Sequence, residues 1–289
     1  MADPAETPSY KYFNLTYPIP YVAQIEIHRP EKLNAFIEPM WHELSTLFTT
    51  LSTSTTTRCI ILTGSGPRAF TTGLDTTTAS TSSSSPLSPT HFPPSTDPAR
   101  RAASIRTHIL SFQSCISSIA SCAKPVVAAI HGFCYGLGID IATCADLRFC
   151  SADASFSVKE VDIGIAADVG TLTRLGKVVG QASWVKDVCL SGRVFGGEEA
   201  GRVGFCGWVG GEGREGVLGE ALRWAGVVVG KSPVAVQGTK EILDWSRDRS
   251  VEDGLRYTAV WNSAMIQTND VPQAIQAGLK KRTPTFEKL

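Results

Sequence analysis

The sequence lacks an excess of charge of either sign. Its 27 lysines and arginines balance 27 aspartates and glutamates, and its longest basic block is the short run LKKR at 279–282. Because nucleic-acid binding needs a basic patch, we predict no nucleic-acid partner. The sequence also lacks any apolar run of about 18 residues, the length that a membrane-spanning helix requires. We therefore predict a chain without a membrane span.

Paired cysteine motifs are missing as well. Eight cysteines lie scattered through apolar segments, with no C-x-x-C motif and no Cys/His pair at zinc spacing. This pattern predicts reduced, buried thiols in an intracellular protein and no metal site. The N-terminal stretch, residues 1–15, is acidic and has no hydrophobic core, so it does not look like a secretion signal.

The chain does contain strands that alternate with helices, followed by helices alone. At 289 residues it can bury the core of one large domain, or of one domain with a small appendage. Apolar patterning predicts strands at 10–18, 21–30, 58–66 and 124–132, helices at 39–51 and 100–122, and a mainly helical region from about 181. We expect an α/β core with an α-helical C-terminal region, divided as 1–19 (N-terminal extension and first strand), 20–200 (core) and 201–289 (helical region).

One low-complexity segment interrupts the core. Residues 76–99 are rich in serine, threonine and proline, which bury too little apolar surface to order a chain. We predict a mobile insertion there.

Two glycine turns follow predicted strands. AFTTGLD covers 69–75, and HGFCYGLGID covers 131–140, where the turn opens a helix. Unpaired N–H groups at such a helix start can bind an anion, although a plain strand-to-helix turn would look the same. The glycines at 132, 136 and 138 do not form the G-x-G-x-x-G fingerprint of a dinucleotide site.

Four segments together resemble the crotonase superfamily of enoyl-CoA hydratases and isomerases. They are HRPEKLNAF, AFTTGLD, KPVVAAIHGFCYGLGIDIATCADLRFCS and FSVKEVDIGIAADVGTLTRLGKVVG, in the family's order and spacing, and the resemblance extends over about 20–285. It implies a ClpP-like spiral of ββα repeats with a helical C-terminal region that assembles trimers or hexamers. It also implies an acyl-CoA thioester substrate and no metal or redox cofactor.

The resemblance assigns an oxyanion hole to the two turns. The backbone N–H groups of Leu74 and Leu137 would bind the thioester oxygen, and fixed donors there stabilise the enolate that forms on proton removal. Leu137 stands where the family usually has glycine, so either its backbone angles are ordinary or the hole is altered. Further substrate-binding positions implied by the match are Thr72, Gly73, Asp75, Thr76 and Gly138.

The resemblance also places three acids. Asp140 and Glu160 match the two glutamates of the hydratases, and Asp168 stands where a hydratase has glycine. That set resembles the Δ3,5-Δ2,4-dienoyl-CoA isomerase branch of the family. Moving the diene needs a proton taken from C2 and another delivered to C6, which suits two carboxylates with pKa values pushed apart. We expect Glu160 and Asp168 to form this pair, in either order, with Asp140 holding Glu160.

Other readings of the same residues stay open. Asp140 can be a helix-start residue, Glu160 can pair with Lys159 or Arg174, and Asp168 can be an N-cap. Asp162 alternates with Glu160 along an extended segment, so it should face away. Alternative functions are an enoyl-CoA hydratase, a Δ3-Δ2-enoyl-CoA isomerase, or an inactive crotonase-fold protein that binds a partner.

The C-terminal tripeptide EKL shares two positions with the peroxisomal signal S-K-L. We expect a peroxisomal protein, or otherwise a mitochondrial or cytoplasmic one.

Overall fold

A computed structural model describes residues 10–289, so the first nine residues of the predicted N-terminal extension lie outside the description. Its strands form a six-stranded sheet in the order β1-β2-β3-β5-β7-β10 and a four-stranded sheet in the order β4-β6-β8-β9. The strands are β1 (Phe13–Ile19), β2 (Val22–Ile27), β3 (Cys59–Gly64), β4 (Ala69–Thr71), β5 (Val126–Ile130), β6 (Phe133–Tyr135), β7 (Leu147–Cys150), β8 (Ser155–Ser157), β9 (Phe195–Gly196) and β10 (Trp208–Val209).

The two sheets are connected by a repeating unit. In each of three successive repeats, the first strand (β3, β5, β7) joins the larger sheet and the second (β4, β6, β8) joins the smaller one, after which the chain turns into a helix. The neighbouring strands of successive repeats run parallel. This arrangement is the predicted spiral of ββα repeats, and it brings the ends of β4 and β6 side by side.

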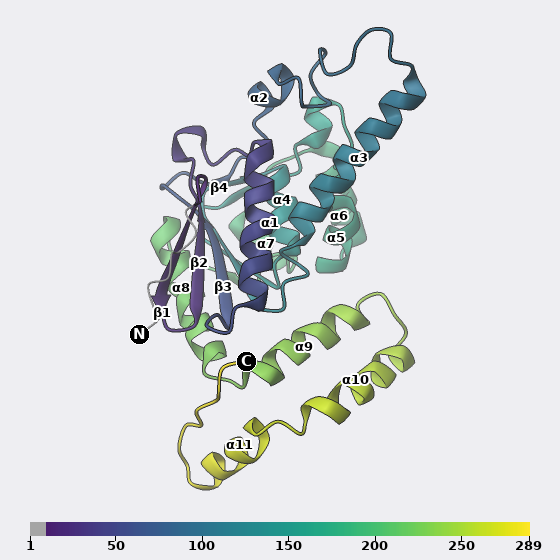
Figure 1. Cartoon of the computed structure of the whole chain (residues 1–289). Coiled ribbons are helices and arrows are strands. Elements are labelled where there is room, and N and C mark those ends of the chain that lie inside the picture. The colour runs from purple at the N-terminus through teal and green to yellow at the C-terminus, as the bar shows by residue number, and fades with distance from the viewer. Residues whose placement is uncertain (1–9) are drawn as a thin grey trace.

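Helices cover both faces of the larger sheet (Figure 1). They are α1 (Glu38–Thr53), α2 (Thr76–Thr81), α3 (Pro98–Ser117), α4 (Leu137–Cys144), α5 (Thr171–Val178), α6 (Ala182–Ser191), α7 (Gly197–Arg202), α8 (Gly213–Val229), α9 (Pro233–Ser246), α10 (Val251–Met265) and α11 (Asp270–Leu279), with 3-10 turns η1 (Pro30–Lys32) and η2 (Glu160–Ile163). No helix within residues 10–289 has both the length and the apolar character needed to cross a membrane.

The core follows the two-residue period of the strands. Alternate side chains of β3, such as Ile60 and Leu62, pack in one cluster with α1 and α3, whereas Ile61 packs against α8 on the other face. Burial on both faces explains why these parallel strands are continuous apolar runs in the sequence. All eight cysteines are buried and free of disulfides, as predicted.

The region 201–289 has two parts. Strand β10 and helix α8 pack on the larger sheet, whereas α9, α10 and α11 extend away from the body of the molecule (Figure 1). The extended part carries several exposed apolar side chains, among them Leu255, which is 66% exposed, and Leu279, which is 81% exposed.

The prediction of a structureless insertion over 76–99 was wrong in part. Helix α2 occupies its first six residues, and α3 begins at Pro98. Asp75 caps α2 by accepting a hydrogen bond from the N–H of Thr78 at 2.9 Å. Composition alone cannot show this, because a local cap and tertiary contacts stabilise a short helix that its propensities would leave unfolded.

Candidate active site

The two glycine turns meet at the carboxyl ends of β4 and β6. These strands pair in parallel, and a Cβ atom placed on Gly73 would lie 2.7 Å from the carbonyl oxygen of Tyr135 and 3.2 Å from the N atom of Leu137. Only glycine fits so close an approach, and its φ of +90° also favours glycine. Gly138 is constrained similarly, since a Cβ there would lie 3.0 Å from Cγ2 of Thr71.

The N–H groups of Leu74 and Leu137 have no acceptor within residues 10–289. The N–H of Asp75 donates to the carbonyl of Phe36, and the N–H of Phe36 donates to the carbonyl of Gly73. Neither hydrogen bond uses the N–H of Leu74, which lies between Gly73 and Asp75. Leu137 is the first residue of α4, where a helix leaves its N–H groups unpaired. Two donors from adjacent turns are therefore available to one anionic oxygen, as predicted.

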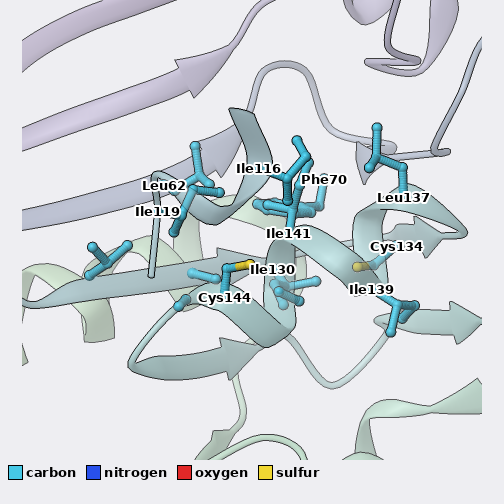
Figure 2. Close-up of a cluster of buried hydrophobic side chains, with 14 of the residues drawn as sticks. Leu62, Phe70, Ile116, Ile119, Ile130, Cys134, Leu137, Ile139, Ile141 and Cys144 are labelled. Atoms are coloured by element: carbon cyan, nitrogen blue, oxygen red, sulfur yellow. The ribbon is translucent and has the colours of Figure 1, made fainter. Parts of the chain in front are cut away.

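Leu137 has ordinary backbone angles. The turn takes its positive φ at Gly136 (51°), and Leu137 is not among the residues of positive φ. Its side chain is 4% exposed and belongs to the buried cluster that also contains Phe70 and Ile141 (Figure 2). The leucine is therefore accommodated by the core, and the first of the two alternatives for this position holds.

Glu160 lies in η2, directly beside the second turn. A Cβ on Gly136 would lie 3.2 Å from Oε1 of Glu160, and Oε2 is buried without a hydrogen-bond partner. Burial raises the pKa of this carboxyl, and the nearby charge of Asp168 raises it further. An unpaired, partly desolvated carboxylate at this place can accept a proton from a bound molecule.

Asp168 lies in the loop before α5 and faces two cavities. Partial burial raises its pKa, and an electrostatic interaction with His108 opposes that shift. The pKa values of Glu160 and Asp168 are both raised, so the expectation that the two environments push them apart stays a prediction.

Asp140 is buried, with 1% exposure, and its partner differs from the expected one. Its Oδ1 accepts hydrogen bonds from the backbone N–H of Thr171 at 2.6 Å and from the Thr171 hydroxyl at 2.8 Å. Burial, followed by the charge of Glu160, raises the pKa of Asp140 to about 7. The side chain therefore fixes the start of α5, and the charge of Glu160 raises its pKa without a hydrogen bond between the two side chains.

A cavity of about 110 Å³ brings the predicted site residues together. Its lining includes Leu74, Leu137, Asp140, Glu160 and Asp168, together with Thr72 and Thr76. Of the other predicted substrate-binding positions, Gly73 and Gly138 shape the turns, and Asp75 caps α2 and pairs with Arg29 at 2.8 Å. The cavity can hold a small planar group between two N–H donors and three carboxyls.

A second, larger cavity of about 550 Å³ adjoins the first, and the sequence did not predict it. It lies among α1, α2 and α3, and its lining shares Leu74, Phe112, Ile165 and Asp168 with the smaller cavity. His108 also lines it and was missed. The apolar faces of α1 and α3 were visible in the sequence, but only their packing shows that space remains between them.

One structural alternative for the acids holds, because Asp140 lies in the first turn of α4. The other two do not: Gly170 rather than Asp168 is the N-cap of α5, and Glu160 has no basic partner within residues 10–289. Lys159 donates to Asp162 at 2.8 Å and not to Glu160, while Arg174 donates to the hydroxyl of Ser117. Asp162 faces away from the acid cluster as predicted, although it lies in the 3-10 turn η2 rather than in an extended segment. Among residues 10–289, no three acidic, histidine or cysteine side chains are grouped as metal ligands.

Comparison with known proteins bears directly on this site. A family model described as enoyl-CoA hydratase/isomerase matches residues 20–92 and 97–288. The chain belongs to this family. It is 39% identical to the mouse mitochondrial Δ(3,5)-Δ(2,4)-dienoyl-CoA isomerase, with 97% of this chain and 84% of that protein covered. It is 41% identical to the peroxisomal Δ(3,5)-Δ(2,4)-dienoyl-CoA isomerase of Arabidopsis thaliana, with 93% of each covered.

The fold agrees with that membership. An enoyl-CoA hydratase from Bacillus anthracis superposes with a TM-score of 0.84 at 23% identity, with 96% of this chain and 99% of that chain covered. The predicted crotonase architecture, with its mixed α/β core and helical C-terminal region, is therefore confirmed.

Proposed function

We propose that this member of the family is a Δ3,5-Δ2,4-dienoyl-CoA isomerase. The observation that carries the proposal is the position of Asp168 beside the same small cavity as Glu160 and the two free N–H groups. The names of the mouse and Arabidopsis relatives support it. The substrate is an acyl-CoA thioester with double bonds at C3 and C5.

Each of the two acids is assigned to one reacting carbon atom of the substrate. Glu160 lies against the turn that presents the Leu137 N–H, so a thioester oxygen bound there places C2 next to Glu160. Asp168 lies at the junction of the two cavities, where the chain continues away from the thioester and C6 is expected. We therefore assign proton removal at C2 to Glu160 and protonation at C6 to Asp168.

The reaction then balances without an external reagent. The carboxylate of Glu160 takes the C2 proton, and the electron pair delocalises through the diene onto the thioester oxygen, where the two N–H groups stabilise it. As the electrons return, C6 takes the proton of the Asp168 carboxyl, and the product has double bonds at C2 and C4. Glu160 then releases its proton to water and Asp168 takes one up from water, which restores both carboxyls for the next turnover. Substrate and product are isomers, so the proposal needs no electron carrier and assigns no role to a metal.

Asp140 has a supporting part in this scheme. Its carboxyl is held by Thr171 and its pKa is raised to about 7, so below neutral pH it is mainly protonated and leaves the negative charge to Glu160. In a hydratase, two carboxyls facing one water are the natural set. Because Asp168 adds a third carboxyl at the cavity, the arrangement favours the isomerase over that alternative.

A paired assay tests the proposal. Purified protein should convert a 3,5-dienoyl-CoA into its 2,4-isomer, seen as a shift in ultraviolet absorbance, faster than it hydrates a 2-enoyl-CoA. Rapid hydration without a diene shift would favour the hydratase, and no reaction with either substrate would favour the inactive binding protein.

We further propose that the protein assembles as a trimer or hexamer through α9–α11, whose exposed apolar residues support this. For the compartment, we propose the peroxisome or the mitochondrion, which appear in the names of the two relatives. Imaging the full chain as a fluorescent fusion distinguishes them.

A further inference from the structure

The first glycine turn is held by the fully buried side chain of Thr71, the last residue of β4. The Thr71 hydroxyl donates a hydrogen bond to the carbonyl of Asn34 at 2.7 Å. Because a hydroxyl has a single proton, its oxygen can act toward other neighbours only as an acceptor. The N–H of Gly73 donates to that oxygen at 3.1 Å. Thr71 therefore connects Asn34 to the turn that carries Leu74.

Asn34 is a fixed anchor for this contact. Its side chain is fully buried, and its Nδ2 donates to the carbonyls of Ser65 and Ala69 at 2.9 Å each. Its Oδ1 accepts a hydrogen bond from the N–H of Arg29 at 3.0 Å. Its φ of 58° lies in the left-handed region, which asparagine tolerates better than most residues. These contacts hold the Asn34 carbonyl in one direction, toward Thr71.

The methyl group of Thr71 contacts the second glycine turn. A Cβ atom placed on Gly138 would lie 3.0 Å from Cγ2 of Thr71, so the methyl group packs directly against that glycine. Gly138 follows Leu137, the second of the two donors. A β-branched side chain that is confined on both branches keeps one χ1 rotamer. The Thr71 hydroxyl therefore cannot turn away from Gly73.

The N–H of Leu74 lies between two peptide groups that are each held by a hydrogen bond. On one side, the N–H of Asp75 donates to the carbonyl of Phe36 at 2.8 Å. On the other side, the N–H of Gly73 donates to the Thr71 hydroxyl. Because glycine has the widest choice of backbone angles, the peptide at Gly73 depends on this contact for its orientation.

We propose that Thr71 is a positioning residue, whose hydroxyl holds Gly73 so that the N–H of Leu74 points at the thioester oxygen. The inference rests on the proposed function, because that function places the thioester oxygen between the two turns. It goes further by making the rate depend on a buried hydroxyl of β4 that does not contact the substrate.

Four variants test this role. Thr71→Val keeps the branched shape of the side chain and removes the hydroxyl, whereas Thr71→Ser retains the hydroxyl and is the conservative rescue. Thr71→Ala also removes the hydroxyl, with less bulk beside Gly138, and replaces Thr71→Val if that variant does not fold. Thr63→Val is the matched control, since the Thr63 hydroxyl is also buried and donates to the carbonyl of Ala129 at 3.0 Å within the larger sheet.

Steady-state kinetics with a 3,5-dienoyl-CoA give the first measurement. Thr71→Val should lower kcat by about tenfold or more and change KM less than about threefold, because a misdirected donor weakens transition-state stabilisation. Thr71→Ser should stay within about threefold of the wild-type kcat. Thr63→Val should lose stability toward urea, since it also removes a buried hydroxyl, but should keep the wild-type kcat. An unchanged kcat in Thr71→Val, or an equal loss in Thr63→Val, would overturn the inference.

Infrared spectroscopy of a bound thioester separates this inference from the proposed function. Octanoyl-CoA with carbon-13 at its carbonyl cannot isomerise, and hydrogen bonds from the two turns should lower its carbonyl stretching frequency on binding. Thr71→Val should remove about half of that shift, because one of two donors is misdirected, whereas Thr71→Ser and Thr63→Val should retain it.

The two measurements together distinguish the possible failures. If the infrared shifts follow this pattern but wild type isomerises no diene, the positioning role stands and the proposed function falls. If wild type isomerises the diene and Thr71→Val keeps the full infrared shift, the proposed function stands and the positioning role falls.

Discussion

Asp168 is the proposed proton donor to C6. Asp168→Asn keeps the size of the side chain and removes its ability to donate a proton to C6. We expect kcat for the dienoyl substrate to fall about 100-fold or more with little change in KM, because the interaction lost acts in the transition state. Asp162→Asn is a suitable control, since Asp162 is exposed and pairs with Lys159. Near-normal turnover by Asp168→Asn would show that the acid at C6 is misassigned.

A substitution at Leu137 tests the backbone N–H donor separately from the side chain. Leu137→Gly retains the N–H, so turnover should stay within about tenfold of wild type. The same change removes a buried side chain from the core and adds backbone freedom, so the free energy of unfolding should fall by about 3 kcal/mol or more. Steady-state kinetics and urea unfolding measure the two effects. A large gain in kcat would mean that the leucine obstructs the oxyanion hole.

Asp140 links the site to the pH dependence of stability. Its pKa in the folded protein is about 7, against an ordinary value of 3.8, so between these values the folded state binds more protons than the unfolded state. Stability due to this group is therefore full below about pH 4 and is lost as the pH rises through 7. Relative to Asp140→Asn, wild type should lose about 2 to 3 kcal/mol of unfolding free energy between pH 5 and pH 8.

Urea unfolding at both pH values, with the protein concentration fixed, measures that difference. A wild-type stability that rises with pH relative to Asp140→Asn would reverse the sign and contradict a neutral, buried Asp140. Since Asn can still accept the hydrogen bond from the Thr171 N–H, the comparison isolates the charge.

At the scale of residues, the sequence predicted which acids lie at the site but not which groups they contact. Resemblance identified Asp140, Glu160 and Asp168, and the structure groups all three around one cavity. It could not show that Asp140 is held by Thr171, because residues 31 positions apart meet only after folding. His108 was missed for the same reason, since nothing in the local sequence of α3 points to Asp168.

At the scale of elements, α2 depends on its cap. Asp75 accepts from the Thr78 N–H and pairs with Arg29, and the net effect of these contacts lowers its pKa despite partial burial. Asp75→Ala should cost about 1 kcal/mol of stability and speed amide hydrogen exchange in Thr76–Thr81. Asp75→Asn should restore much of the cap but not the ion pair. Unchanged exchange in Asp75→Ala would show that packing alone holds α2.

The strands and long helices were predictable because their patterns are strong and local. Strand β3 is a continuous apolar run, and α1 has an apolar face, so both were placed within a few residues of their observed bounds. Helix α2 and the 3-10 turn η2 were not, because they are short and are stabilised by tertiary contacts rather than by sequence period. The errors therefore fall next to the site, where local propensity and function compete.

At the scale of the whole molecule, the solvent-accessible surface area is larger than that of a compact monomer. The chain exposes 14799 Å², whereas a compact monomer of this length exposes about 12,000 Å². Extension of α9–α11 from the body contributes to this difference (Figure 1). The sequence could not show it, because the same apolar faces would suit helices packed on their own core.

The last prediction concerns what covers α9–α11. Val251 and Leu255 of α10 and Leu279 of α11 are 66% exposed or more, and burying such side chains between subunits would contribute about 1.5 to 3 kcal/mol each. Light scattering should therefore give a mass three or six times that of the chain. Leu255→Asp should shift the protein toward monomer, whereas Val227→Asp, which alters an exposed apolar residue of α8, should not. A monomeric wild type, or equal effects of both changes, would rule out assembly through this region.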